Sequence, residues 1–131
     1  MLRVVDANLN RAREGLRVCE EVARFILEKP QLTRRCQQIR YDLSRLGRSL
    51  GRADLIKARN SRQDVGRPAV RVKIASHQGV RDLVTANSQR VEEAFRVLEE
   101  FTRLSSARLS KEFGILRFRV YSLERDLLSE L

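Results

Sequence analysis

The chain has 131 residues and a net charge of +10, with 42% hydrophobic and 34% charged residues, which is a globular composition. No apolar stretch reaches the roughly 18 residues of a membrane span, and the N-terminus lacks a signal-peptide core, so we expect a cytoplasmic protein without a membrane partner. The excess charge is mainly arginine, which attracts anions such as nucleic acid, anionic membranes or phosphorylated metabolites.

Helical periodicity predicts four long helices, with a linker of about 51–78 that contains a short helical turn at 53–58. Asp6 or Asn8 is the predicted cap of the first helix. Pro30 is expected to end that helix and to lie in the first turn of the next. The predicted helices cover residues 6–28, 31–50, 79–104 and 107–129.

An internal repeat is the most informative feature of the chain. Residues 6–24 (DANLNRAREGLRVCEEVAR) and 85–103 (TANSQRVEEAFRVLEEFTR) are identical at nine of 19 positions. The following segments carry apolar stripes with the same 4-3-4-3-4 spacing, each with an arginine and then an aromatic residue after its third member. The stripes are Leu32, Cys36, Ile39, Leu43, Leu46 and Leu50 in the first copy, and Leu109, Phe113, Leu116, Val120, Leu123 and Leu127 in the second.

The predicted fold class is therefore all-α: a four-helix bundle made of two duplicated helix hairpins joined by a long linker. We expect one domain over residues 1–131, with repeat 1 at about 6–50, the linker at about 51–78 and repeat 2 at about 79–129. A pseudo-two-fold axis should relate the two hairpins.

On a helical wheel, Asn8 falls within the apolar face of the first helix, with Arg11 at its edge beside Gly15. That face contains Ala12, Leu16, Cys19, Val22, Ala23 and Ile26. The equivalents of the three site positions in repeat 2 are Asn87, Arg90 and Ala94. We therefore expect each repeat to point an amide and a guanidinium inward, next to a small residue that leaves room.

A buried guanidinium needs an anion, because desolvating an unpaired charge is costly. One interpretation is an internal network with Glu14, Glu93 or the second helix of each hairpin. The interpretation that we favour is an anionic ligand between the repeats, since the paired asparagines and the small residues suit it. Glu14 and Glu93 lie near the apolar boundary, where they could hold a metal or orient the arginines.

Other polar residues carry weaker signals. The predicted polar face holds Arg17, Glu20, Arg24, Arg96, Glu99 and Arg103, and the spacings of Arg17–Glu21 and Arg96–Glu100 favour structural salt bridges. Cys19 and Cys36 are expected to be reduced core thiols. His77 is the only histidine, which excludes a histidine-based metal cluster or triad. No Walker or GxGxxG motif is present, and composition alone favours a solvated linker at 59–66.

Four segments together resemble the small monofunctional hydroxymethylpyrimidine phosphate kinases of thiamin biosynthesis, which are often fused to the N-terminus of thiamine phosphate synthase. The segments are DANLNRAREGLRVCEEVARF, the Arg59 to Asp64-Val65-Gly66 element, ANSQRVEEAFRVLEEF and LRFRVYSLE. They span essentially the whole chain in the order of the family. The stretch between Arg59 and Asp64 is less acidic than in the family, so those intervening residues are not carried over.

The resemblance implies an ATP-dependent phosphotransferase that phosphorylates hydroxymethylpyrimidine monophosphate with Mg²⁺ as cofactor. Such chemistry depends on positioning and charge cancellation, and an ionised phosphate acceptor needs no strong base. The residues predicted to serve catalysis are Arg11, Arg90, Glu14 and Glu93. Those predicted to bind substrate or nucleotide are Asn8, Asn87, Arg59, Asp64 and Gly66. The candidate Mg²⁺ ligands are Glu14, Glu93 and Asp64.

Other classes of protein compete with this hypothesis. A basic helical nucleic-acid-binding module explains the net charge, although aromatic residues make up only 5% of the chain. An accessory interaction module associated with thiamine phosphate synthase, and a helical mutase that holds dicarboxylates, are further alternatives. The expected partners are a small phosphorylated pyrimidine, ATP, and thiamine phosphate synthase, fused or separate. The sequence leaves a monomer and a homodimer both open.

Overall fold

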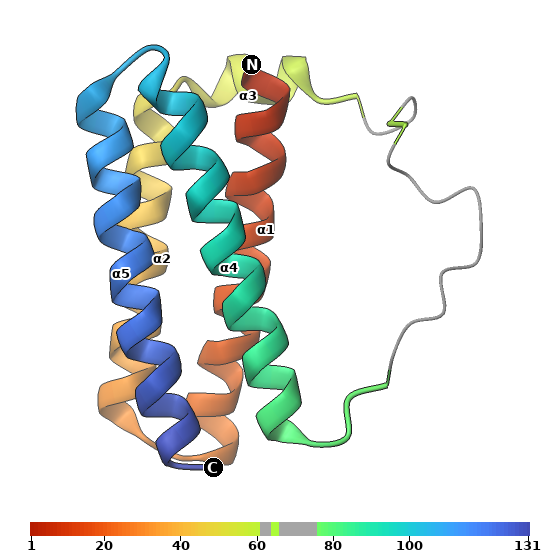
Figure 1. Cartoon of the computed structure of the whole chain (residues 1–131), viewed down its shortest axis with the longest axis vertical. Helices are drawn as coiled ribbons and strands as arrows, with labels where there is room; N and C mark the ends of the chain where they lie inside the picture. Colours follow the sequence, from red (N-terminus) through yellow and green to blue (C-terminus); the bar gives the residue numbers. More distant parts are fainter. Residues whose placement is uncertain (61–63, 66–75) are drawn as a thin grey trace.

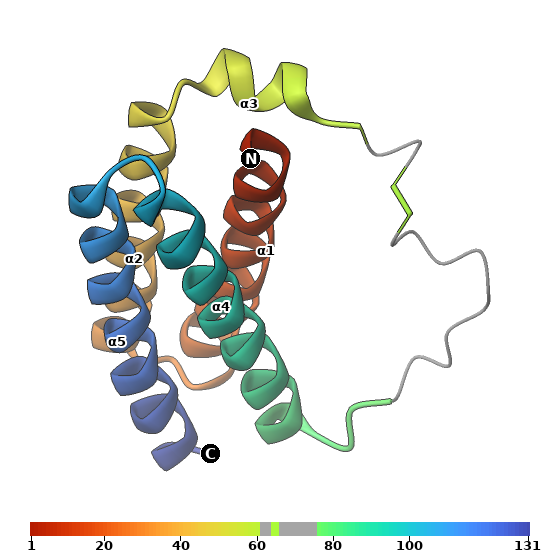
Figure 2. The same ribbon diagram turned by 45° about the horizontal axis from the view of Figure 1, so that its top comes forward.

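The computed structural model describes residues 1–60, 64–65 and 76–131. Four long helices form a bundle, and a short helix lies across one end of it (Figures 1 and 2). The elements are α1 (Leu2–Glu21), a π-helical segment (Val22–Ile26), α2 (Pro30–Ser49), α3 (Arg52–Ala58), α4 (Val80–Arg103) and α5 (Ala107–Ser129). These described ranges contain no strand, which confirms the all-α prediction.

The four long helices form a closed ring of antiparallel neighbours (Figure 1). Helix α1 packs on both α2 and α4, and α5 packs on the same two helices from the other side. The hairpins α1–α2 and α4–α5 cover the segments predicted to be repeats. Their first helices, α1 and α4, therefore meet directly along the bundle, where the predicted site residues lie.

The apolar stripes of α2 and α5 supply ten of the 23 buried hydrophobic residues in the described part of the chain. Ten of their twelve predicted members are buried, and only Leu50 and Leu109, at the ends of the stripes, are partly exposed. Cys19 and Cys36 are both free and buried, as predicted. Burial raises the pKa of the Cys36 thiol to about 12. None of the helices in the described ranges is both long and apolar enough to span a bilayer.

The start of the first helix was predicted wrongly. Helix α1 begins at Leu2, so neither Asp6 nor Asn8 caps it. Both residues lie within the helix, where the Asn8 amide donates to the Val4 carbonyl oxygen at 2.8 Å. The residues before Asp6 form part of an amphipathic turn that buries Val5 against the core, and this tertiary packing extends the helix.

The end of this helix also differs from the prediction. The chain widens into a π-helical segment, in which the Leu27 amide donates to the Val22 carbonyl oxygen at 2.9 Å. The i→i+5 bonding changes the angular step per residue, so the helical wheel fails beyond Val22 and Ala23, which are buried. Ile26, predicted to face the core, is 54% exposed.

Glu20 and Glu99, assigned to the polar face, are instead turned toward the second helix of each hairpin. Glu20 is only 2% exposed and accepts hydrogen bonds from Arg40 and from Gln37 Nε2 at 3.3 Å. Glu99 forms the matching pair with Arg117 at 3.1 Å. The arginine partners are the ones that precede the aromatic residues in the repeated pattern.

The salt bridges predicted on the outer face of the bundle are confirmed. Arg17 Nη2 lies 2.6 Å from Glu21 Oε1, and Arg96 Nη2 lies 2.6 Å from Glu100 Oε1. These four side chains are 38–53% exposed, so their role is local helix support.

Candidate functional site

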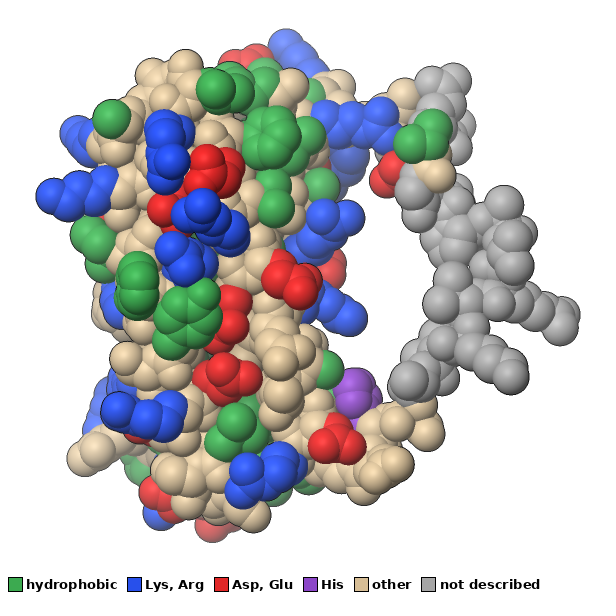
Figure 3. All heavy atoms as spheres, in the orientation of Figure 1, with side chains coloured by type: hydrophobic (Ala, Val, Ile, Leu, Met, Phe, Trp, Pro, Cys, Tyr) green, Lys and Arg blue, Asp and Glu red, His purple; other side chains and the backbone are tan. Residues whose placement is uncertain are grey.

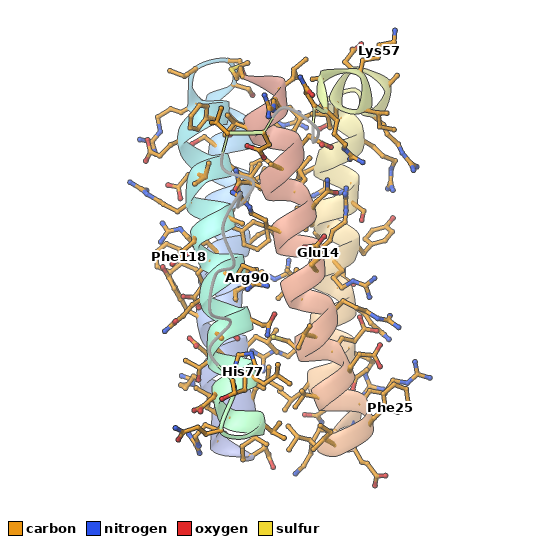
Figure 4. All side chains as sticks on the ribbon, turned by 90° about the vertical axis from the view of Figure 1, so that its right-hand side faces the viewer. Glu14, Phe25, Lys57, His77, Arg90 and Phe118 are labelled. Atoms are coloured by element: carbon orange, nitrogen blue, oxygen red, sulfur yellow. The ribbon has the colours of Figure 1, made fainter. Side chains whose placement is uncertain are left out.

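A cavity of about 420 Å³ lies between α1 and α4 and is built from both repeats. Its lining comprises Asn8, Arg11, Glu14, Arg90, Glu93, Ala94 and Val97. Figure 4 shows Glu14 on α1 and Arg90 on α4 at a similar height along the bundle, on the same side of it. The structure thus brings together all four residues predicted to serve catalysis, along with one of the two asparagines.

The small residues beside this α1–α4 cavity have different roles in the two repeats. A Cβ at Gly15 would lie 2.6 Å from Val91 Cγ2 and 2.8 Å from the Asn87 carbonyl oxygen, so α4 fills the space that we expected a ligand to use. Its equivalent, Ala94, does line the cavity. Gly15 therefore sets the close approach of the two helices, and the prediction that it leaves room for a ligand is wrong.

Arg11 and Arg90 are exposed, which corrects the prediction that they point into the core. Arg11 Nη1 donates to Asn8 Oδ1 at 3.3 Å. Within the described part of the chain, neither arginine forms a salt bridge, although Glu14 and Glu93 line the same cavity. Both guanidinium groups are therefore accessible to an anion from solution.

The two asparagines are both buried, and each side-chain amide donates a hydrogen bond to the backbone carbonyl oxygen four residues earlier in its own helix. The amide of Asn8 donates to Val4, and that of Asn87 donates to the Leu83 carbonyl oxygen at 2.8 Å. Only Asn8 lines the cavity, where its Oδ1 atom orients Arg11. Asn87 contacts Gly15 through its backbone, so the repeat equivalents are not equally placed toward a ligand.

The α1–α4 cavity balances two arginines against two glutamates, with Ala94 and Val97 as apolar lining. Such a site suits a compound that carries a phosphate together with a cationic group, because an anion alone would meet two carboxylates. The described residues contain no group of three His, Cys, Asp or Glu side chains that could hold a metal. Mg²⁺ at Glu14 and Glu93 stays a prediction.

Two described residues of the predicted linker, Arg59 and Asp64, are not part of the lining of this cavity. Arg59 donates from Nε and Nη2 to the two carboxylate oxygens of Asp6, each at 2.8 Å. Asp64 Oδ1 lies 3.7 Å from Arg3 Nη2, away from Glu14 and Glu93, with which it was predicted to share a metal. Gly66, also predicted to bind substrate, lies outside the described residues.

Arginines that our sequence interpretation did not single out line a second cavity, between α1, α2 and α3. They are Arg13, Arg48 and Arg52. The search for repeated identities could not find Arg13, because its equivalent in repeat 2 is Glu92. The sequence signal would have been Gly47, a glycine in the interior of a helix, which marks a close approach by another group.

Charged side chains are interspersed on the face formed by α4 and α5. Figure 3 shows basic, acidic and hydrophobic side chains side by side on this face, with no continuous basic stripe. Exposed hydrophobic residues here include Ile115 and Phe118, which are 50% and 63% exposed. A nucleic-acid interface would be expected to concentrate basic residues, so this face does not favour one.

Comparison with known proteins places the chain in a family. The family model described as "ThiD2 family" matches residues 3–126. The chain belongs to the ThiD2 family. A protein of Synechocystis sp. named thiamine-phosphate synthase is 45% identical over 126 residues, which cover 96% of this chain and 36% of that protein. No solved structure matches the chain.

Further relatives bear the same name. Those of Thermosynechococcus vestitus and Nostoc punctiforme are 42% and 38% identical, over 95% and 96% of this ThiD2-family chain. The chain spans about a third of the length of these curated relatives. The shared name contradicts our prediction of an ATP-dependent hydroxymethylpyrimidine phosphate kinase, because these relatives are named for the synthase reaction and not for a kinase. The assignment of kinase and ATP-binding roles is therefore withdrawn.

Proposed function

We propose that this chain is a ligand-binding helical domain that serves the synthesis of thiamine phosphate, and that the α1–α4 cavity binds thiamine phosphate. Proteins named thiamine-phosphate synthase contain a region that matches nearly the whole chain and that occupies about a third of their length. This region accompanies the synthase in those relatives. The synthase portion is therefore the first partner to test, whether fused to the chain or separate from it.

The pairing of charges in the α1–α4 cavity is the observation that carries the proposal. Thiamine phosphate joins an anionic phosphate to a permanently cationic thiazolium ring and an aminopyrimidine. Arg11 and Arg90 supply charge-assisted donors for the phosphate. Glu14 and Glu93 complement the cationic ring and accept from the amino group, while Val97 and Ala94 contact apolar ring atoms.

Mg²⁺ is proposed as an alternative partner of these two carboxylates, in place of the cationic ring. A single Mg²⁺ is commonly held by one or two carboxylates together with phosphate oxygens and water. Glu14 and Glu93 would supply two carboxylates for such an ion. In this arrangement the ion would bind with the phosphate, and its affinity for the protein alone would be low.

Calorimetric titration tests the proposal with three ligands: thiamine phosphate, thiamine and inorganic phosphate, each with and without Mg²⁺. The variant is the double substitution Arg11→Ala/Arg90→Ala. Its matched control is Arg17→Ala/Arg96→Ala, which removes the same charge from the same two helices at exposed repeat-equivalent positions.

We expect thiamine phosphate to bind more tightly than either thiamine or phosphate alone. The double variant should weaken that binding by about tenfold or more, the loss expected when charge-assisted hydrogen bonds are removed. The control should bind as the parent does. Absence of binding by folded protein, or equal losses in both double variants, would overturn the proposal for this cavity.

A further inference from the structure

The cavity between α1, α2 and α3 is distinct from the proposed ligand site. It has a volume of about 470 Å³ and shares no lining residue with the α1–α4 cavity. Residues from α1, α2 and α3 line it, and Arg59 joins them just beyond the last turn of α3. Figure 2 shows α3 lying across the end of the bundle where α1 begins and α2 ends. This size lies within the range of small-molecule sites.

Positive charge converges on this α3 cavity. Four arginines and one aspartate line it, and the aspartate, Asp6, is bound on both oxygens by Arg59 at 2.8 Å. The described residues offer no salt bridge to Arg13, Arg48 or Arg52. Three guanidinium groups from three different helices thus share one cavity, whose single lining carboxylate, that of Asp6, is already hydrogen-bonded by Arg59.

Gly47 creates the place where Arg13 lies. A Cβ at residue 47 would stand 3.2 Å from Arg13 Nη2, so the guanidinium rests against α2 where a side chain would otherwise be. Arg13 Nη1 donates to Asn10 Oδ1 at 3.0 Å, which holds the side chain in this position. Burial lowers the pKa of Arg13, the carboxylate of Asp6 opposes this shift, and the nearby Arg52 and Arg59 add to it.

We infer that the α3 cavity is a binding site for a small compound that carries a diphosphate group. Arginine forks match phosphate oxygens, and several guanidinium groups that converge on one concave site favour an anion with more than one charge. The α1–α4 cavity differs because its two arginines are opposed by two glutamates. Since the arginines of the α3 cavity surround a pocket and do not line an extended surface, the site favours a compact anion over a nucleic-acid backbone.

Titration calorimetry at constant ionic strength tests this inference with inorganic pyrophosphate as the probe. Inorganic phosphate and sulfate serve as anions of lower charge, and a duplex oligonucleotide tests the other class of ligand. The variant is Arg48→Ala/Arg52→Ala, both exposed, with Arg34→Ala/Arg108→Ala as an exposed control of equal charge. Gly47→Ala provides a second, charge-neutral variant, whose Cβ requires the Arg13 guanidinium to shift by a few tenths of an ångström.

Pyrophosphate should bind more tightly than phosphate or sulfate. The Arg48→Ala/Arg52→Ala variant should lose about tenfold or more in affinity, and Gly47→Ala should weaken binding with no change in charge. The exposed control Arg34→Ala/Arg108→Ala should keep the parent affinity. Because Gly47, Arg48 and Arg52 line the α3 cavity and not the α1–α4 cavity, losses in their variants assign the binding to the α3 cavity. The inference is overturned if pyrophosphate fails to bind, if the control loses as much as the variant, or if only the oligonucleotide binds.

Discussion

Gly15 of α1 lies directly against Asn87 of α4, where a Cβ would stand 2.8 Å from the Asn87 carbonyl oxygen. The contact joins the first helices of the two hairpins. Because the neighbouring atoms include backbone, they cannot yield as the end of a flexible side chain could. This contact fixes the distance between the two walls of the α1–α4 cavity.

Gly15→Ala should therefore destabilise the fold by about 1–3 kcal/mol, the usual cost of overpacking. The matched control is Gly114→Ala, because Gly114 also lies within a helix but a Cβ there would stand 3.5 Å from Glu99 Cδ, an ordinary contact. That control should stabilise by about 0.5–1 kcal/mol through helix propensity. Urea unfolding measures both, and equal effects of the two substitutions would contradict the packing argument.

The buried Glu20 carboxylate depends on Arg40. Arg40→Ala removes the partner that the neighbouring helix supplies to Glu20, a carboxylate that is 2% exposed, so we expect a loss of about 1–3 kcal/mol. Arg17→Ala is the control, because Arg17 is 52% exposed and its bridges should contribute less than about 1 kcal/mol. Chemical denaturation should separate the two variants; similar losses would show that Arg40 acts only as a surface charge.

Glu92 should make stability depend on pH. Burial and the carboxylate of Glu124 raise its pKa to about 7 from a usual value of 4.5. The folded state therefore holds a proton that the unfolded state has lost, and stability should fall as the pH rises from about 4.5 to about 7. Glu92→Gln should flatten this part of the profile of unfolding free energy against pH. The exposed neighbour Glu93 supplies the control Glu93→Gln, and an unchanged profile in Glu92→Gln would refute the assignment.

The two thiols should react only when the chain unfolds. Cys19 and Cys36 are buried, and burial raises the pKa of both, that of Cys36 to about 12. A thiol reagent at pH 8 should label neither residue rapidly in native protein and both in denaturant. Cys19→Ala then assigns the remaining label to Cys36. Rapid labelling of the native protein would mean that this part of the core opens readily.

The sequence predicted the helices and the core well, because both depend on periodic apolar patterns. The stripes in α2 and α5 needed only the period of a regular helix. The same reasoning failed at Ile26, where the helix changes its hydrogen-bond pattern. It failed again at Glu20, because a wheel cannot show that Arg40 approaches from another helix.

The candidate site was predicted in part. Repeat identity singled out Arg11, Arg90, Glu14 and Glu93, which do meet in one cavity, because α1 and α4 pack against each other. Their exposure was not predictable, since it depends on how closely α1 and α4 approach. The family motif led us to predict that Arg59 binds substrate or nucleotide in the same site. Its hydrogen bonds to Asp6 instead place it at the end of the bundle.

The α1–α4 cavity draws on two copies of one motif that no longer match each other. Asn8 lines the cavity and its equivalent, Asn87, does not. Ala94 also lines the cavity, whereas its equivalent, Gly15, packs against α4. A homodimer of a single hairpin would present identical halves and would favour a ligand with two identical ends. Because both copies lie in one chain and differ in sequence, the lining of the cavity is asymmetric, which suits a ligand with two different ends.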